Sequence, residues 1–340
     1  MSVYDLDLPA LQSVLESWNE PSYRSRQIWE GVYKRLYGSW SEFTTLPRAL
    51  RSRLAKEFDL RVVTPAVKSE SADRQTEKTA FTLPDGQRIE TVLMRYTKRA
   101  TLCISTQVGC AMGCVFCATG QMGFRRNLES GEIVAQVIYY ARRVRDEGRK
   151  LTNIVLMGMG EPLHNYKNTM MAIDRLNDET GFGFGERRFT ISTVGLVPLI
   201  RRFADEHRQV NLAISLHAAD DGMRSQMLPV NRKYPIGELL DACRYYTTQT
   251  GRRLTFEWAL IQGVNDTPEV ARKLAALLKG LLCHVNAIPL NPTEGYHGAA
   301  TTRGSAALFR SELERMGVGC TIRLRRGIDI GAGCGQLVGV

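Results

Sequence analysis

Long apolar runs are missing from this 340-residue sequence. No stretch approaches the roughly 18 apolar residues that a membrane-spanning helix needs, and the opening residues, MSVYDLDLPALQSVLESW, have no basic region followed by an apolar one. Low-complexity tracts and short internal repeats are also missing. We therefore expect a cytoplasmic protein with no membrane anchor. A composition of 44% hydrophobic and 24% charged residues is ordinary for a globular chain.

Acidic residues are fewer than basic ones. Lys and Arg number 45 against 35 Asp and Glu, which gives a formal net charge of +10. Such an excess favours a polyanionic partner, because phosphate backbones release counterions when basic side chains bind them. Residues 23–56 mix basic side chains with aromatic ones such as Trp29, Tyr33 and Trp40. The mixture is typical of a small helical module that binds RNA, although the same aromatics could instead fill the core of that module.

Four segments differ in their hydrophobic pattern. Residues 1–60 have helical spacing, and residues 61–98 alternate apolar and polar positions around an Asp-Gly turn, which is typical of a β-hairpin linker. Residues 327–340 form a glycine-rich tail. In residues 99–326, amphipathic stretches separate the apolar runs TLCIST, NIVLMG, RFTIST, VNLAISLH, RLTFEWALI, HVNAIPLN and CTIRLR.

Strands that alternate with helices predict an α/β fold with a parallel sheet. Six or seven units are visible in the sequence, so we expect a partial barrel of the (β/α)6 type. The small N-terminal helical domain and the β-hairpin linker would precede it. In such barrels the site lies at the carboxyl ends of the strands.

Three cysteines fall within eight residues, directly after the first expected barrel strand: Cys110, Cys114 and Cys117. Thiolates are the usual ligands of iron–sulfur clusters, and three ligands would leave one iron of a four-iron cluster open to another molecule. A zinc site would need a fourth Cys or His nearby, and no His lies in the loop. Disulfide bonds are a poor explanation of these cysteines, because the chain shows no secretion signal.

The spacing of these cysteines, with Phe116 directly before the last, resembles the signature of the radical S-adenosylmethionine superfamily. The resemblance implies that the amine and carboxylate of S-adenosylmethionine bind the open iron, and that reduction cleaves the cofactor to a 5′-deoxyadenosyl radical. Such a cofactor needs polar groups at strand ends on one rim of the barrel. Each residue there could be only a turn or cap residue, but four similar strand ends favour a binding site. The candidates are Gly160, Glu161, Ser192, Ser215, Leu216, His217 and Asn291.

Two further cysteines have unusual positions. Cys103 lies on the strand that leads into the three-cysteine loop, and Cys334 lies in the glycine-rich tail, where a side chain has little to pack against. Buried, inert cysteines are the ordinary case. That explanation suits Cys243, Cys283 and Cys320 but not Cys334.

Motifs along nearly the whole chain closely resemble the RlmN/Cfr family of radical S-adenosylmethionine RNA methyltransferases, which methylate adenine carbons. The matching segments are residues 23–29, 90–92, 103–117, 123–128, 157–162, 215–217 and 329–337.

The resemblance implies a role for each reactive residue. The three-cysteine loop would hold one 4Fe-4S cluster. Cys334 would take a methyl group from one S-adenosylmethionine, and a second one, cleaved at the cluster, would provide the radical that activates this methyl group for addition to adenine. Cys103 would release the product by forming a disulfide with Cys334. Glu90 would be the proton acceptor.

The motifs at residues 23–29 and 123–128 are most similar to those of C2-methylating members. They imply methylation of C2 of a specific adenine in 23S rRNA, near the peptidyl-transferase centre, and of the adenosine 3′ of the anticodon in tRNA. C2 is electron-poor and cannot attack a sulfonium, which explains the need for a radical. C8 methylation and a redox-sensing iron–sulfur RNA-binding protein are the alternatives. The resemblance also implies a monomer that receives electrons from a reductant such as flavodoxin or ferredoxin.

Overall fold

The computed structural model describes residues 1–339. Its α-helices are α1 (Leu8–Ser17), α2 (Tyr23–Tyr33), α3 (Arg48–Glu57), α4 (Ala118–Gln121), α5 (Ser130–Asp146), α6 (Tyr166–Asn177), α7 (Val197–Asp205), α8 (Asp221–Met227), α9 (Ile236–Thr250), α10 (Pro268–Leu278) and α11 (Arg303–Arg315). Within the described range, no helix combines the length and the apolar character that crossing a membrane requires.

The strands are β1 (Thr64–Glu70), β2 (Thr76–Thr82), β3 (Arg88–Arg95), β4 (Ala100–Cys103), β5 (Gln107–Gly109), β6 (Phe124–Asn127), β7 (Asn153–Leu156), β8 (Phe189–Thr193), β9 (Asn211–Ser215), β10 (Leu254–Leu260), β11 (Cys283–Pro289) and β12 (Cys320–Ile322).

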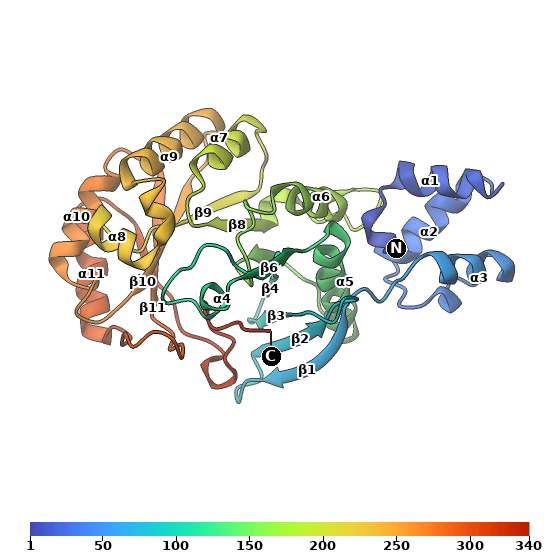
Figure 1. Ribbon diagram of the computed structural model, residues 1–340, viewed down its shortest axis with the longest axis horizontal. Helices are drawn as coiled ribbons and strands as arrows, with labels where there is room; N and C mark the ends of the chain where they lie inside the picture. The colour runs from blue at the N-terminus through green and yellow to red at the C-terminus, as the bar shows by residue number, and fades with distance from the viewer. Residues whose placement is uncertain (340) are drawn as a thin grey trace.

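One ten-stranded sheet runs in the order β1-β2-β3-β4-β7-β8-β9-β10-β11-β12. Its strands from β4 to β12 are parallel. Helices α5, α6, α7, α9, α10 and α11 follow successive parallel strands and cover the outer face (Figure 1). Strands β1 and β12 form the two ends of the sheet in residues 1–339, so the barrel is open. The predicted partial barrel is confirmed, and each of the seven expected apolar runs contains a parallel strand.

The segment before the barrel is larger than a hairpin linker. Strands β2 and β3 pair antiparallel around the expected turn, where Gly86 has φ +82°. Strand β1 adds a third antiparallel strand, and β3 pairs with β4, so the segment continues the barrel sheet. Strand β1 was not predicted, because its side chains are almost all exposed and it contains Pro65 at a register shift.

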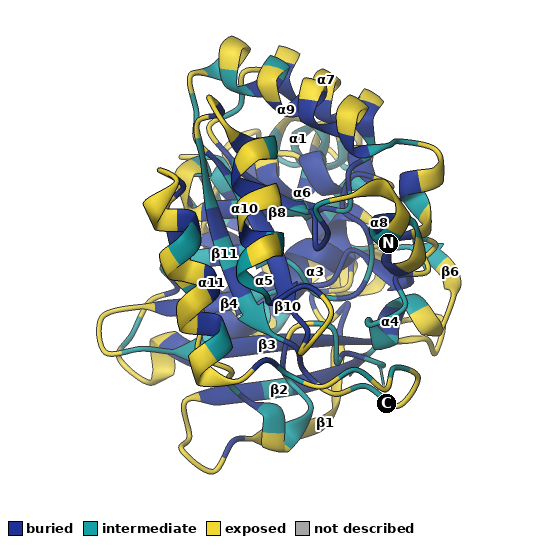
Figure 2. Ribbon diagram, turned by 90° about the vertical axis from the view of Figure 1, so that its left-hand side faces the viewer, coloured by how far each residue is buried: buried dark blue, intermediate teal, exposed yellow. Residues whose placement is uncertain are grey.

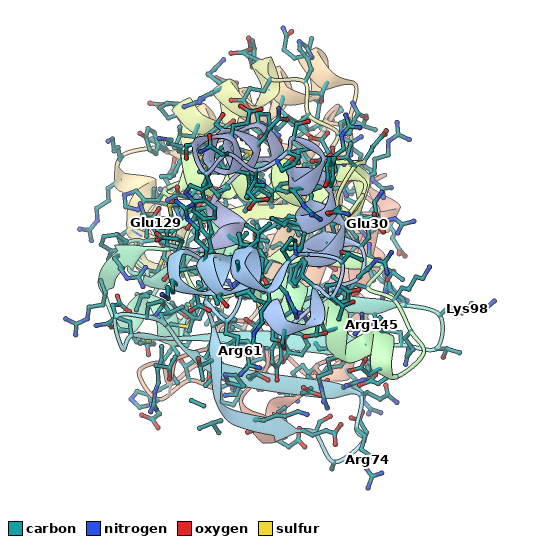
Figure 3. All side chains as sticks on the ribbon, turned by 90° about the vertical axis from the view of Figure 1, so that its right-hand side faces the viewer. Glu30, Arg61, Arg74, Lys98, Glu129 and Arg145 are labelled. Carbon is teal, nitrogen blue, oxygen red and sulfur yellow. The ribbon has the colours of Figure 1, made fainter. Side chains whose placement is uncertain are left out.

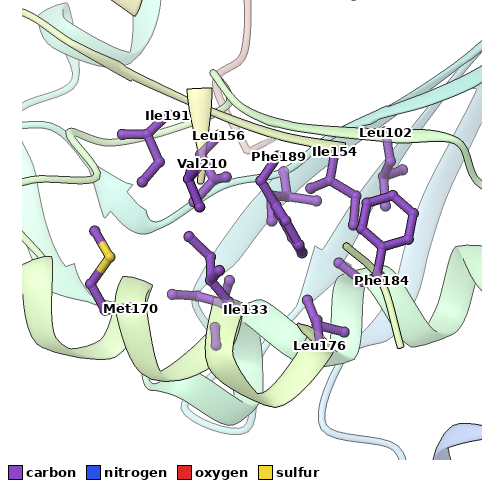
Figure 4. Close-up of a cluster of buried hydrophobic side chains, with 14 of the residues drawn as sticks. Leu102, Ile133, Ile154, Leu156, Met170, Leu176, Phe184, Phe189, Ile191 and Val210 are labelled. Carbon is purple, nitrogen blue, oxygen red and sulfur yellow. The ribbon is translucent and has the colours of Figure 1, made fainter. Parts of the chain in front are cut away.

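Alternation along the parallel strands separates an apolar outer face from a polar inner face. In β8, Phe189 and Ile191 are fully buried and point toward the helices, whereas Thr190 and Ser192 alternate with them and face the other side of the sheet. Figure 4 shows side chains of α5 and α6, among them Ile133 and Leu176, packed against β7 and β8. Each such buried side chain stabilises the fold by roughly 1.5–3 kcal/mol, and Figure 2 shows the buried layer between sheet and helices.

Helices α1 to α3 lie at one end of the molecule, beside α5 (Figure 1). Trp29 and Tyr33 are each 2% exposed and Trp40 is 8% exposed, so these aromatics fill the core of the helical segment. Tyr23, in contrast, is 52% exposed. The sequence had left both possibilities open, and for the three buried aromatics the structure favours the packing explanation.

Candidate active site

The three-cysteine loop is closed by a small sheet that the sequence did not predict. Strand β5 precedes the loop and β6 follows it, and the two pair antiparallel. The Cys110 amide donates to the Gly123 carbonyl at 3.0 Å. Gly109 has φ +71°, and a Cβ there would lie 1.9 Å from the Gly123 oxygen. Only glycine therefore permits this closure.

The thiols of Cys110, Cys114 and Cys117 line a cavity of about 140 Å³ at the carboxyl ends of the strands. Burial raises the pKa of Cys110 to about 12 and that of Cys114 well above its usual value, since the thiolates would be desolvated and close to one another. In residues 1–339 no three His, Cys, Asp or Glu side chains converge on a single metal ion. Thiolates are the usual ligands of iron–sulfur clusters, so these three thiols are the candidate ligands for one.

Six of the seven cofactor-binding candidates line the same cavity: Gly160, Glu161, Ser192, Ser215, His217 and Asn291. They come from the ends of β7, β8, β9 and β11, as the strand-end pattern suggested. Leu216 does not line the cavity, because its side chain is fully buried in the core and its amide donates to the Glu257 carbonyl.

Glu161 has both carboxylate oxygens occupied. Oε1 accepts from the Leu163 amide at 3.0 Å and Oε2 accepts from the Val194 amide at 2.9 Å. Burial nevertheless raises its pKa to about 7. A carboxylate that joins the ends of β7 and β8 in this way shapes the cavity wall and supplies negative potential to a bound cation.

His217 adopts a left-handed backbone conformation with φ +59°. Its Nδ1 accepts from the Ala259 amide at 2.9 Å, which places the ring proton on Nε2. Burial, assisted by the nearby Arg224 guanidinium, lowers the pKa of His217 to about 3. The ring is therefore a neutral hydrogen-bond donor at the cavity wall.

Asn291 connects the cavity to the tail. Its Nδ2 donates to the Cys334 carbonyl at 3.0 Å, while its Oδ1 is buried without a hydrogen-bond partner. A buried amide oxygen without a donor is costly unless a ligand supplies one. The ammonium or a ribose hydroxyl of S-adenosylmethionine would do so, and the residues present fit that cofactor.

A second cavity of about 380 Å³ occupies the inside of the barrel. Polar side chains on the inner face of the strands line it, including Cys103, Thr190, Glu257 and Asn286. Closed barrels of this class have interiors filled by branched apolar side chains. Apolar side chains such as Val92 and Ile288 line this cavity as well. A cavity of this size with a mixed lining is a binding space for a small organic group.

Cys334 lines both cavities, and Cys103 lines only the inner one. Cys334 is an exposed residue. Its sulfur nevertheless lies among the protein atoms of the cavity walls, and this desolvation raises its pKa to about 12. Burial raises the pKa of Cys103 to about 12 as well. Both residues are free thiols. The structure thus places the tail cysteine between the three-cysteine loop and the barrel interior.

Backbone hydrogen bonds seat the tail beside this loop. The Ala118 amide donates to the Gly335 carbonyl at 2.7 Å, and Thr119 Oγ1 donates to the Leu337 carbonyl at 2.6 Å. Figure 1 shows the tail running past α4 toward β3.

Glu90 lines neither cavity. It is fully buried on β3, where Lys78 Nζ lies 3.0 Å from Oε1 and the Val338 amide donates to Oε2 at 2.9 Å. The predicted proton acceptor therefore lies beneath the seated tail.

Two functional candidates were missed in the sequence. Glu257 lies within an apolar run, yet it lines both cavities and accepts from Asn286 Nδ2 at 2.8 Å. A lone carboxylate in an otherwise apolar strand was the available signal. Arg224 is fully buried and donates to the carbonyls of Val194, Ser215 and Leu216, so it ties together the loops after β8 and β9. Nothing in the sequence around Arg224 pointed to this role.

Two family models match the chain. The model of the radical SAM superfamily matches residues 104–275. The model of the ribosomal RNA large subunit methyltransferase N-terminal domain matches residues 1–60.

Similar proteins extend over the whole chain. The dual-specificity RNA methyltransferase RlmN 1 of Myxococcus xanthus is 51% identical over 99% of this chain and 94% of its own length. A probable dual-specificity RNA methyltransferase RlmN of Chloroflexus aurantiacus is 47% identical over 99% of this chain and 92% of its own. The crystal structure of a radical SAM methyltransferase from Sphaerobacter thermophilus superposes with a TM-score of 0.98, at 51% identity and full coverage of both chains.

Members of this superfamily use a 4Fe-4S cluster and S-adenosylmethionine, and the residues of the cavity fit both. The chain belongs to the radical SAM superfamily and, within it, to the RlmN-type RNA methyltransferases.

Proposed function

We propose that this enzyme methylates C2 of a specific adenine in 23S rRNA, near the peptidyl-transferase centre, and C2 of the adenosine 3′ of the anticodon in tRNA. It would do so through an S-methylcysteine at Cys334 and use two S-adenosylmethionine molecules per turnover. The proposal places the reaction in the cytoplasm, where both RNAs and a low-potential reductant such as flavodoxin or ferredoxin are found. The enzyme would act as a monomer.

The position of Cys334 carries the proposal. Its side chain borders both the cavity of the three-cysteine loop and the inner cavity that contains Cys103. A thiol in that place can receive a group on one side and deliver it on the other. Most radical chemistry on small molecules has no need of such a carrier or of a second thiol beside it.

When bound, the cluster and S-adenosylmethionine supply the methyl group and the 5′-deoxyadenosyl radical. Cys334 would accept the methyl group on sulfur as S-adenosylhomocysteine leaves. The S-methyl group would then lose one hydrogen atom to the 5′-deoxyadenosyl radical, which becomes 5′-deoxyadenosine, and its carbon would join C2 of the base, so that the base is held on the tail. The radical adduct would give back the one electron that reduction of the cluster had supplied. Glu90 accepts the proton from C2. Cys103 attacks the Cys334 sulfur, which forms the disulfide and breaks the sulfur–carbon bond, and the released carbon takes a proton to become the product methyl group.

Basic and aromatic side chains frame the mouth of the inner cavity. Tyr96 lies between two guanidinium groups, those of Arg99 at 4.2 Å and Arg326 at 4.4 Å from its ring centroid. Arg323 and Arg325 also line this cavity. Guanidinium groups beside an open cavity suit a nucleotide whose base has been turned out of its stack.

Further basic residues are exposed on the side of the molecule that carries the N-terminal helices. Figure 3 shows Arg61, Arg74, Lys98 and Arg145 there. Contacts to the phosphate backbone by such residues would hold a folded RNA while one adenosine enters the cavity.

The test is Cys334→Ala, assayed with 23S rRNA fragments and tRNA under anaerobic, reducing conditions. We expect no methyladenine, because the methyl carrier is missing, while the 4Fe-4S absorption stays as in the wild type. Cys283→Ala, which changes a cysteine outside both cavities, is the matched control and should methylate RNA normally. Methylation by the Cys334→Ala variant would overturn the mechanism.

Mass spectrometry of rRNA and tRNA from cells with and without the enzyme identifies the product. The proposal requires 2-methyladenosine in both RNAs. 8-Methyladenosine would instead assign the enzyme to C8 chemistry, and 2-methyladenosine in rRNA alone would remove tRNA from the proposal.

A further inference from the structure

Two residues on neighbouring strands hold the tail on both sides of Cys334. Lys78 of β2 and Glu90 of β3 are diagonal neighbours on one face, since Lys78 pairs with Val92 and Ala80 pairs with Glu90. Lys78 Nζ lies 3.0 Å from Glu90 Oε1, as an ion pair that is not aligned as a hydrogen bond. The Lys78 side chain is 15% exposed and that of Glu90 is fully buried.

Each partner of this ion pair also binds the tail backbone. Lys78 Nζ donates to the Gly331 carbonyl at 3.3 Å, three residues before Cys334. Glu90 Oε2 accepts from the Val338 amide at 2.9 Å, four residues after Cys334. The two contacts therefore span the methyl-carrying position, and both depend on the same pair of charges.

We propose that Lys78 is a positioning residue which, together with Glu90, clamps the tail and sets Cys334 between the two cavities. The inference rests on the proposed function for the role of Cys334, but the clamp itself is a property of the resting enzyme. Glu90 has two tasks in this scheme. While the tail is seated, its carboxylate holds Val338, and it is free to accept a proton from the base only after that contact opens.

Burial explains why the clamp depends on Lys78. A fully buried carboxylate without its cation is an uncompensated charge, and the surrounding structure must open to water to accommodate it. The Glu90 carboxylate binds the tail directly, through the Val338 amide. The tail is therefore the segment that we expect to loosen. From Cys334 to Leu337 the other contacts of the tail are neutral hydrogen bonds, which are weaker than those to charged groups. They come from Asn291, Ala118 and Thr119, and from Gln336 to the Pro292 carbonyl.

The first test separates the Val338 amide from its side chain. Val338→Pro removes the amide hydrogen that Glu90 accepts, and Val338→Ala keeps it. In the cluster-loaded enzyme without RNA or S-adenosylmethionine, we expect iodoacetamide to alkylate Cys334 about tenfold faster in the proline variant, the effect of losing a hydrogen bond to a charged group. The alanine variant should react as the wild type does. Equal rates in the proline variant and the wild type would overturn the clamp.

The second test addresses Lys78 directly, with Lys78→Met to remove the charge and Lys78→Arg to keep it. Hydrogen exchange should become faster in residues 333–339 of the methionine variant, and S-methylation of Cys334 on addition of S-adenosylmethionine should slow severalfold. The arginine variant should restore slow exchange. General unfolding would instead raise exchange throughout β2, β3 and the barrel strands, and tail exchange unchanged in Lys78→Met would refute the role of Lys78.

The clamp and the proposed function fail separately. Alkylation and hydrogen exchange need no methyl transfer, so they report on the clamp even if wild-type enzyme produces no methyladenine. Conversely, the wild type could methylate RNA while Lys78→Met leaves hydrogen exchange of the tail unchanged. That result would keep the proposed function and refute the clamp alone.

Discussion

Glu257 lies on the wall that separates the two cavities, between β9 and β11 in the sheet. Burial raises its pKa from its usual value of 4.5 to about 7, against the opposing effects of the Asn286 hydrogen bond and the Arg323 charge. Near neutral pH this side chain therefore exists in both protonation states. A carboxyl group of this kind can donate a hydrogen bond in one state and accept a proton in the other.

The folded protein binds this proton more tightly than the unfolded chain does. The resulting stability is present below pH 4.5 and is lost as the pH rises through 7, where the buried carboxylate must ionise. Glu257→Gln mimics the protonated form at every pH. We expect the glutamine variant to gain about 2 kcal/mol in free energy of unfolding, relative to the wild type, between pH 5.5 and pH 8.

Urea unfolding of both cluster-free proteins at the two pH values measures this difference. Glu257→Gln should retain the hydrogen bond with Asn286, so a variant that loses stability equally at both pH values would contradict the assigned protonation.

At the residue level, the strand-end pattern predicted which candidate side chains lie together. Six of seven cofactor candidates line one cavity because parallel strands bring their carboxyl ends to a common rim. Leu216 was grouped with its polar neighbours, but alternation turns its side chain into the core. Glu257 was missed because its strand is otherwise apolar, and its inward direction depends on register, which the sequence does not show.

Among the structural elements, the cysteine loop depends on one close backbone approach. It starts at β5 and ends at β6, and the approach of Gly109 to the Gly123 carbonyl closes it. Neither strand was predicted, since each has only three or four residues and no alternation of apolar and polar side chains. Strand β1 was missed for the related reason that both its faces are exposed.

Gly109→Ala should therefore impair cluster assembly. The added Cβ meets the Gly123 oxygen at 1.9 Å and forces the loop open. Gly123→Ala is the matched control, since Gly123 also has a positive φ, of +74°, but has nothing within 4 Å of an added Cβ. Its cost is backbone strain alone, about 1–2 kcal/mol.

We expect iron and sulfide content after anaerobic reconstitution to fall severalfold in Gly109→Ala and to stay near the wild-type level in Gly123→Ala. Equal cluster content in the two variants would show that the close approach does not govern assembly.

Across the whole molecule, exposed basic residues occur at both ends. Helix α3 exposes Arg48 and Lys56. At the opposite end of the molecule in Figure 1, α10 exposes Lys273, and Lys279, directly after α10, is exposed too. Sequence composition predicted a polyanionic partner but not the surface that meets it, because net charge contains no information on position.

Neutralising Arg48 and Lys56 together, as Arg48→Gln with Lys56→Gln, should weaken binding of substrate RNA. The plot of log affinity against log salt concentration has a negative slope. If each residue contacts one phosphate, this slope becomes less negative by about 2. S-Methylation of Cys334, which involves no RNA, should be unchanged.

Fluorescence anisotropy with labelled tRNA at several salt concentrations makes the measurement. The double variant Lys273→Gln with Lys279→Gln removes the same charge at the other end of the molecule. If both double variants change the slope equally, the N-terminal helices have no special part in holding RNA.

The seated tail also has a consequence for how the enzyme is made. Val338 and Glu90 are 248 residues apart in the chain, and Leu337 and Thr119 are 218 apart. Because a chain folds progressively from its N-terminus during synthesis, β2, β3 and the cysteine loop are complete long before the tail leaves the ribosome. The loop therefore stays without its tail contacts in the nascent protein until residues 335–337 have been synthesised.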